Sequence, residues 1–201
     1  MPTTARYGFR PSRHLHGITS FNTGRYPVSA NHARSVMPGD VVELLGDGNI
    51  RVIDTSAVSV NERGTLGVVA RVHNSNDRPL THNLPATGNL LPASTAGWAY
   101  VYDDPDIVYV ADADGTASAG NTGMFVRVTA GAGTTAAGIS GMGVKMVDSS
   151  ASSVGHRFKI LGVSPAERLG PSGTEFAGGN DVEVIIADHE FRRMFKRIGA
   201  F

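Results

Sequence analysis

The chain has 201 residues, of which 41% are hydrophobic and only 18% charged, and it contains 25 glycines and 10 prolines. A chain of this length forms one domain, alone or with arms, and this composition is typical of a turn-rich β protein rather than a helical bundle. The absence of cysteine excludes disulfides and thiolate metal sites, no apolar stretch approaches the ~20 residues of a membrane span, and zero formal net charge argues against a dedicated nucleic-acid-binding domain.

Residues 1–36 are predicted to form an extended N-terminal arm. This segment carries five arginines and no acidic residue, and its prolines and glycines interrupt any periodic pattern. Aromatic residues are spread among the arginines, which is unusual for a disordered tail. Either the arm becomes ordered on a partner, or it wraps over its own body. The first alternative predicts these partner-binding residues: Arg6, Tyr7, Phe9, Arg10, Arg13, Phe21, Arg25 and Tyr26. It also predicts that deletion of residues 1–30 leaves a folded body.

The β-rich body is predicted to span residues 37–189. Short apolar or alternating runs separated by Gly, Pro and Asp turns predict about nine strands: 41–45, 50–53, 65–72, 97–102, 107–111, 124–128, 144–147, 157–163 and 182–187. Residues 73–96 are polar, contain three prolines and lack periodicity, so we expect a long surface loop that contacts a neighbour. Many short strands with hardly any helix predict an all-β fold, an antiparallel sandwich or barrel.

The C-terminal tail, residues 190–201, has a different pattern. Its apolar side chains recur at helical spacing: Phe191, Met194, Phe195 and Ile198. Basic residues fill the other side, and so short a helix needs a surface to lie on. That surface is either the body or a partner, and the second alternative adds Phe191, Phe195 and Arg197 to the partner-binding residues.

Residues that could carry chemistry give only weak patterns. Asp112 to Gly115 resembles the start of a calcium loop but lacks the later ligands, so turn formation is favoured over a bound cation. His14 and His16 could share a zinc ion only with a third ligand that the sequence does not indicate. No nucleophile elbow, P-loop or dinucleotide fingerprint occurs. We therefore expect no enzyme activity, no cofactor, no metal site and no catalytic residue.

Five segments resemble a known family. Gly39 to Leu44, Gly48 to Val52 and Gly64 to Ala70 form a pattern similar to the "GD.V.L..DG.I..A......GVV" start of tailed-phage capsid decoration (cement) proteins. Residues 99–109 resemble the "V.DDP...F" segment of structural proteins from marine and cyanobacterial phages, and residues 182–190 resemble their closing strand.

The resemblance implies a non-enzymatic virion protein on the outside of an icosahedral head, assembled in the host cytoplasm. It would bind the major capsid protein and clamp neighbouring subunits, as a homo-oligomer with a trimer favoured. It implies neither a nucleic-acid partner nor a membrane. The alternatives are another virion component, such as a head–tail connector or fibre base, and a carbohydrate-binding β-sandwich module.

Overall fold

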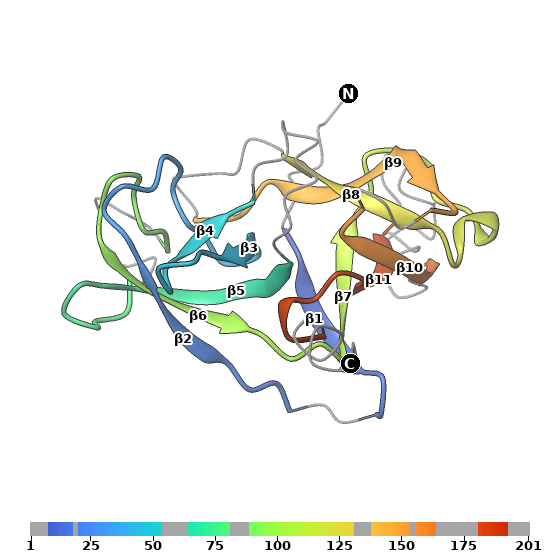
Figure 1. Ribbon diagram of the computed structural model, residues 1–201. Helices are drawn as coiled ribbons and strands as arrows, with labels where there is room; N and C mark the ends of the chain where they lie inside the picture. The colour runs from blue at the N-terminus through green and yellow to red at the C-terminus, as the bar shows by residue number, and fades with distance from the viewer. Residues whose placement is uncertain are drawn as a thin grey trace, which may run out of the picture.

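The computed structural model describes residues 8–17, 20–53, 64–80, 89–130, 138–152, 156–163 and 181–192. These residues form eleven strands, all paired antiparallel in two sheets (Figure 1). The predicted all-β sandwich is confirmed. All nine predicted strands are present, and two more come from the N-terminal segment. Within the described part of the chain, no helix is long and apolar enough to cross a membrane.

The larger sheet has six strands in the order β1-β7-β11-β10-β8-β9. Their bounds are β1 Arg10–His14, β7 Ile107–Asp112, β8 Phe125–Ala130, β9 Met142–Ser150, β10 Phe158–Val163 and β11 Asp181–Ile186, with a short 3-10 turn, η1, at Ala119–Asn121. The sheet curls back on itself. This is seen in two contacts: the amide of Asp114 donates to the carbonyl of Val144 at 3.0 Å, and a parallel bridge joins Ala113 to Val144. The residues after β7 therefore lie beside β9.

The smaller sheet has five strands in the order β2-β6-β5-β3-β4. Their bounds are β2 Gly24–Val28, β3 Val41–Leu44, β4 Ile50–Val52, β5 Thr65–Asn74 and β6 Gly97–Tyr102. The predicted β3–β4 hairpin is present. Gly48 takes a φ of 81° in its turn, a conformation that favours glycine, and the Asp47 carboxylate accepts the amide of Asn49 at 3.0 Å.

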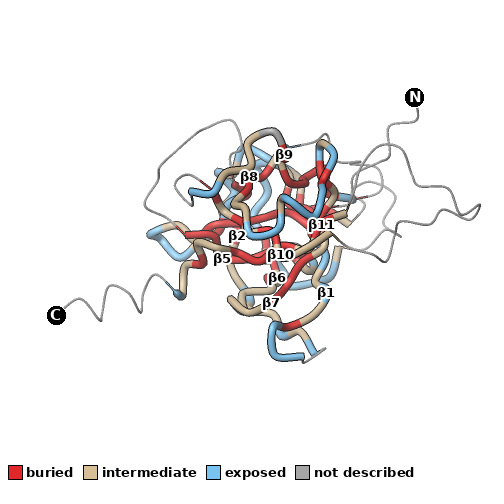
Figure 2. Tube along the Cα trace, turned by 90° about the vertical axis from the view of Figure 1, so that its right-hand side faces the viewer, coloured by how far each residue is buried: buried red, intermediate tan, exposed pale blue. Residues whose placement is uncertain are grey.

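The hydrophobic core lies between the two sheets, as the buried strand segments in Figure 2 show. β6 shows how the sequence produces it: Gly97, Ala99 and Val101 are buried, and the alternate side chains are only partly covered. On the other sheet, Phe158 and Ile160 of β10 are likewise fully buried. The period-two alternation therefore turns one face of each sheet inward.

The N-terminal segment is part of the body in its described residues, which corrects the prediction of a separate arm. The segment lies antiparallel to residues 97–110, and both segments pass between the larger and the smaller sheet side by side. β1 pairs with β7, β2 pairs with β6, and both are edge strands. Each contains a proline, Pro11 or Pro27, which is tolerated at a sheet edge and discourages pairing with another chain. The alternative in which the segment wraps over its own body therefore holds for these residues.

Two other predicted segments differ from expectation. The expected surface loop 73–96 begins inside β5, and Leu91 is fully buried and pairs with Val36 across a bridge, so this end of the loop belongs to the core. Residues 81–88 lie outside the described residues. Of the C-terminal tail, residues 190–192 are helical and Phe191 packs against the core, while residues 193–201 lie outside the described part.

Candidate partner-binding face

The structure separates the predicted partner-binding residues into three groups. Arg6, Tyr7, Phe195 and Arg197 lie outside the described residues. The aromatic residues are turned toward the core: Phe9 is 2% exposed, and Phe21, Tyr26 and Phe191 are partly buried against it. The prediction of a direct contact through Phe9 is therefore wrong, since its ring stacks on Phe158 at a centroid distance of 4.7 Å. Arg10, Arg13 and Arg25 keep exposed or partly exposed side chains.

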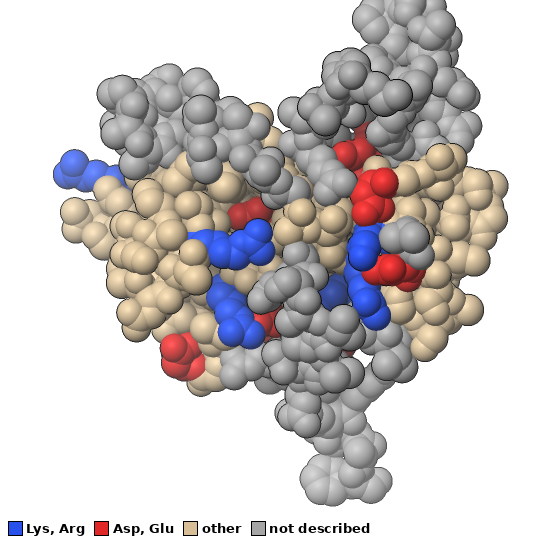
Figure 3. Space-filling model, turned by 90° about the horizontal axis from the view of Figure 1, so that it is seen from above, with Lys and Arg blue, Asp and Glu red and all other residues tan. Residues whose placement is uncertain are grey.

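Several basic residues at the two ends of the chain bind acidic residues of its own middle part. Arg13 pairs with Glu183 at 2.9 Å, and Arg192 pairs with Asp106. His14 and His16 lie 3.7 and 3.6 Å from the carboxylates of Asp104 and Asp106. On the face seen in Figure 3, basic and acidic side chains likewise adjoin one another. The uneven charge along the sequence is therefore partly balanced by the fold itself.

Tyr26 shows the same inward role. Its hydroxyl donates to the Asp103 carboxylate at 2.6 Å. Burial, and next this hydrogen bond, raise the pKa of Tyr26 far above its ordinary value. The hydrogen bond joins the N-terminal segment to the connection between β6 and β7, so Tyr26 supports the fold rather than offering a free hydroxyl to a partner.

Arg25, in contrast, belongs to a group of side chains on the smaller sheet in which the two arginines are exposed, the proline and the two aromatic rings are partly covered, and the histidine is buried. The strand register places two rows of residues across β2, β6 and β5. We call this group the Arg–aromatic face; one row is Arg25, Tyr100 and Arg71, and the other is Pro27, Trp98 and His73. Directly opposed residues on adjacent strands project from the same side of a sheet, so the six side chains are neighbours.

Both arginines of the Arg–aromatic face lie over aromatic rings. The guanidinium carbon of Arg25 is 3.7 Å from the ring centroid of Trp98, and that of Arg71 is 4.1 Å from the ring centroid of Tyr100. A cation over an aromatic ring is attracted by the negative ring face, and a planar guanidinium can stack there with its N–H groups still free at its edge. The rings therefore hold the arginines in place.

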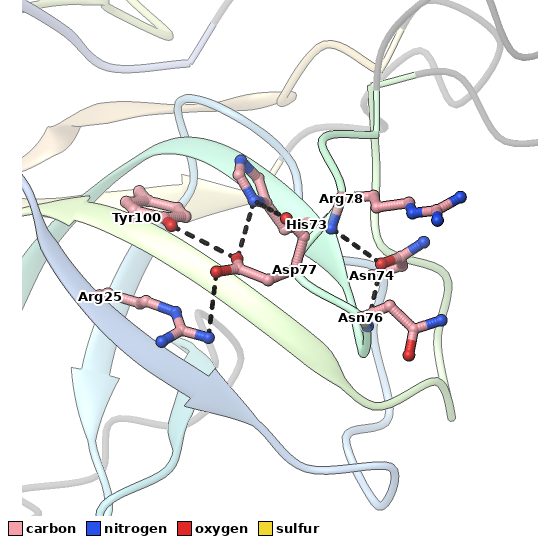
Figure 4. A network of polar contacts seen from close by, with 7 residues as sticks. All are labelled: Arg25, His73, Asn74, Asn76, Asp77, Arg78 and Tyr100. Atoms are coloured by element: carbon pink, nitrogen blue, oxygen red, sulfur yellow. Dashed lines mark hydrogen bonds and ion pairs between the residues drawn. The ribbon is translucent and has the colours of Figure 1, made fainter.

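Asp77 fixes the edge of this face (Figure 4). Its carboxylate lies 2.9 Å from Nδ1 of His73, accepts the hydroxyl of Tyr100 at 3.3 Å and pairs with Arg25 at 3.2 Å. It follows β5 in a tight turn where its φ is 58°, a left-handed conformation that aspartate tolerates better than most residues. Asn74 closes this turn by accepting two backbone amides at 3.0 Å.

The arrangement offers a pre-ordered binding surface. Arginine, tryptophan and tyrosine are the residue types that contribute most to binding energy at protein interfaces. Because the stacks and Asp77 already restrict these side chains, a partner would have little additional side-chain entropy to remove. Sequence reasoning selected Arg25 alone; the alternation of residues 97–102 could have shown that Trp98 and Tyr100 share a face.

Two buried carboxylates of the interior have structural partners. Asp40 is buried, accepts the Ser140 hydroxyl at 2.6 Å and the Met37 amide at 2.8 Å, and burial raises its pKa from 3.8 to about 6. Glu43 is buried between Arg51 and Arg157, at 2.5 and 3.5 Å. These contacts join the two sheets or the ends of their strands, which explains them without a ligand.

No metal centre emerges from the described ranges. No group of three or more His, Cys, Asp or Glu side chains gathers there in a way that could hold an ion. His14 and His16 face different aspartates, and the Asp114 carboxylate accepts the amide of Met146 at 2.7 Å. The aspartates of this region therefore form turn and cross-strand contacts.

Comparisons with known proteins assign the chain to no family. No family model, no curated protein and no solved structure matches it.

Proposed function

We propose that the protein is a structural component of a phage virion. In this proposal it binds the outside of the assembled capsid as a homo-oligomer and cements neighbouring major capsid subunits, without enzyme activity. The observation that carries the proposal is the Arg–aromatic face, on which Arg25 and Arg71 are stacked over Trp98 and Tyr100. The sequence resemblance to capsid decoration proteins supplies the identity of the partner.

The physical basis is mass action. A protein that binds the assembled lattice, and not its separated subunits, stabilises the lattice by its binding free energy. Many copies that each touch more than one subunit add avidity without new contacts. A rigid β body with a pre-ordered face suits this role, because little conformational entropy is lost on binding.

The revised contact surface differs from the one expected from sequence. Arg25 stays at its centre, Trp98 and Tyr100 join it, and Arg10 and Arg13 lie on the exposed edge strand β1 of the other sheet. Phe9 acts only indirectly, because its stacking on Phe158 anchors the residues next to that strand to the core.

Sedimentation of phage heads with purified protein tests the proposal. Wild-type protein should co-sediment with intact, expanded heads. Trp98→Ala removes a stacked ring, and loss of such a contact typically costs about 2 kcal/mol or more, or roughly thirtyfold in affinity. Lys159→Gln is a matched control, since Lys159 also lies over an aromatic ring, Phe125, but on the other sheet. No association of the wild type with heads, or equal binding by both variants, would contradict the proposal.

Two alternatives make different predictions. A head–tail connector or fibre base would bind at one vertex, whereas a cement protein covers the lattice. A carbohydrate-binding module would stack a sugar on an exposed ring, but Arg25 covers one face of Trp98 at 3.7 Å. Specific binding on a glycan array would favour the carbohydrate alternative.

A further inference from the structure

Arg71 differs from the two arginines of the smaller sheet that form ion pairs with acidic side chains. Arg25 pairs with Asp77, and Arg51 pairs with Glu43. Arg71 is exposed and lies over Tyr100, and no acidic side chain within the described residues pairs with it. A stacked guanidinium presents its N–H donors at its edge, in a fork that matches the two oxygens of a carboxylate.

We propose that Arg71, supported by Tyr100, binds a carboxylate of an acidic protein segment. This inference rests on the proposed function, because it names the chemistry of the surface that the Arg–aromatic face would contact. Tyr100 has two roles here: its ring supports Arg71, and its hydroxyl donates to Asp77. The Asp77 contact orients the ring and thereby the cation above it.

The charges around Arg71 favour a protein segment over a polyanion such as nucleic acid. Asp77 lies on the same face, and its side chain keeps 38% of its area exposed beside Arg25. The phosphates of a nucleic acid follow one another along its backbone and would come close to this carboxylate, whereas a flexible peptide can bring one carboxylate to Arg71 and turn its other side chains away from Asp77. The mixture of signs therefore favours a partner that contributes a single carboxylate at Arg71.

The geometry also predicts which substitutions matter. Arg71→Lys keeps the positive charge but loses the planar fork and the stack, so binding should weaken as it does for Arg71→Ala. Tyr100→Leu keeps an apolar side chain but removes both the ring beneath Arg71 and the hydroxyl that donates to Asp77. Lys159→Gln removes one positive charge above a ring elsewhere and should leave binding unchanged.

A peptide titration with the full chain tests the inference. The probes are fluorescein-labelled hexaglutamate, hexaglutamine and a dodecathymidylate oligonucleotide, measured by anisotropy at low salt. We expect hexaglutamate to bind in preference to hexaglutamine, and about tenfold or more weaker binding for Arg71→Ala and Arg71→Lys than for the wild type or Lys159→Gln. In the wild type, hexaglutamate should shift the side-chain Nε–H resonance of Arg71 in a nitrogen–proton NMR spectrum, which requires no variant.

Each result decides the question. No binding of hexaglutamate, an unshifted Arg71 resonance, or equal binding by Arg71→Lys and wild type would overturn the inference, as would tighter binding of the oligonucleotide. If hexaglutamate fails while wild-type protein still decorates heads, only the carboxylate site is wrong. If hexaglutamate binds through Arg71 but the protein does not bind heads, the proposed function is wrong.

Discussion

Phe9→Ala tests whether the N-terminal segment is part of the folded body. Phe9 is 2% exposed, its ring stacks on Phe158 at 4.7 Å, and its amide donates to the carbonyl of Gly39 at 3.0 Å. Truncation of a buried phenylalanine typically costs about 3–5 kcal/mol through lost burial and the cavity that remains. For a domain of this size, that cost corresponds to a fall in melting temperature of roughly 6–20 °C.

Urea unfolding followed by circular dichroism measures this loss as a lower midpoint with an unchanged slope. Leu15→Ala is the matched control, since Leu15 lies in the same segment and is 43% exposed, so its truncation should change the free energy of unfolding by about 0.5 kcal/mol or less. If Phe9→Ala cost no more than Leu15→Ala, the segment would not be held by the core. Deletion of residues 1–30 should accordingly abolish the fold, because it removes both β1 and β2 and leaves β6 and β7 with unpaired edges.

Three further substitutions test the interior. Burial raises the pKa of Asp40 from 3.8 to about 6, so the proton bound in the folded state stabilises the fold below about pH 4. This stabilisation, about 3 kcal/mol, is lost as the pH rises through 6. Asp40→Asn should remove this pH dependence from the midpoints of urea unfolding. Burial lowers the pKa of His189 from 6.5 to about 4, so its contribution to stability has the opposite sign: it is present above pH 6.5 and lost as the pH falls through 4. His189→Gln removes this loss, so the stability of the variant relative to the wild type should be higher at pH 4 than at pH 7. The same difference between variant and wild type at both pH values would contradict the assignment. Gly67→Ala should destabilise the protein by about 1–3 kcal/mol, because a Cβ there would lie 2.0 Å from the carbonyl oxygen of Tyr102. Gly162→Ala is the control, since a Cβ at that position would meet no atom within 4 Å. Equal thermal stability of the two variants would refute the packing argument.

The body was predictable from sequence because its strands carry local signals. β6 alternates buried and half-buried residues, as its sequence indicates, and β3 and β4 flank a Gly/Asp turn. β1 and β2 gave no such signal. Each contains a proline and polar residues, which local rules count against a strand. Only their position at the sheet edges makes those residues compatible with pairing, and that position depends on contacts with residues 69 to 100 positions away in the chain.

The candidate site was predictable only in part, for the same reason. Arg25 was selected for its charge and its aromatic neighbour Tyr26, but Tyr26 turns toward Asp103 instead. The rings that support the arginines, Trp98 and Tyr100, come from a different strand, and the register of three strands decides that they meet. Such a surface depends on long-range pairing, which no local pattern specifies.

Cryo-electron microscopy of phage heads incubated with the wild-type protein tests the central claim most directly. The account predicts added density on the outside of the lattice, repeated between neighbouring major capsid subunits over the whole head, with the Arg–aromatic face turned toward the capsid. Heads without added density, or density confined to a single vertex, would contradict it.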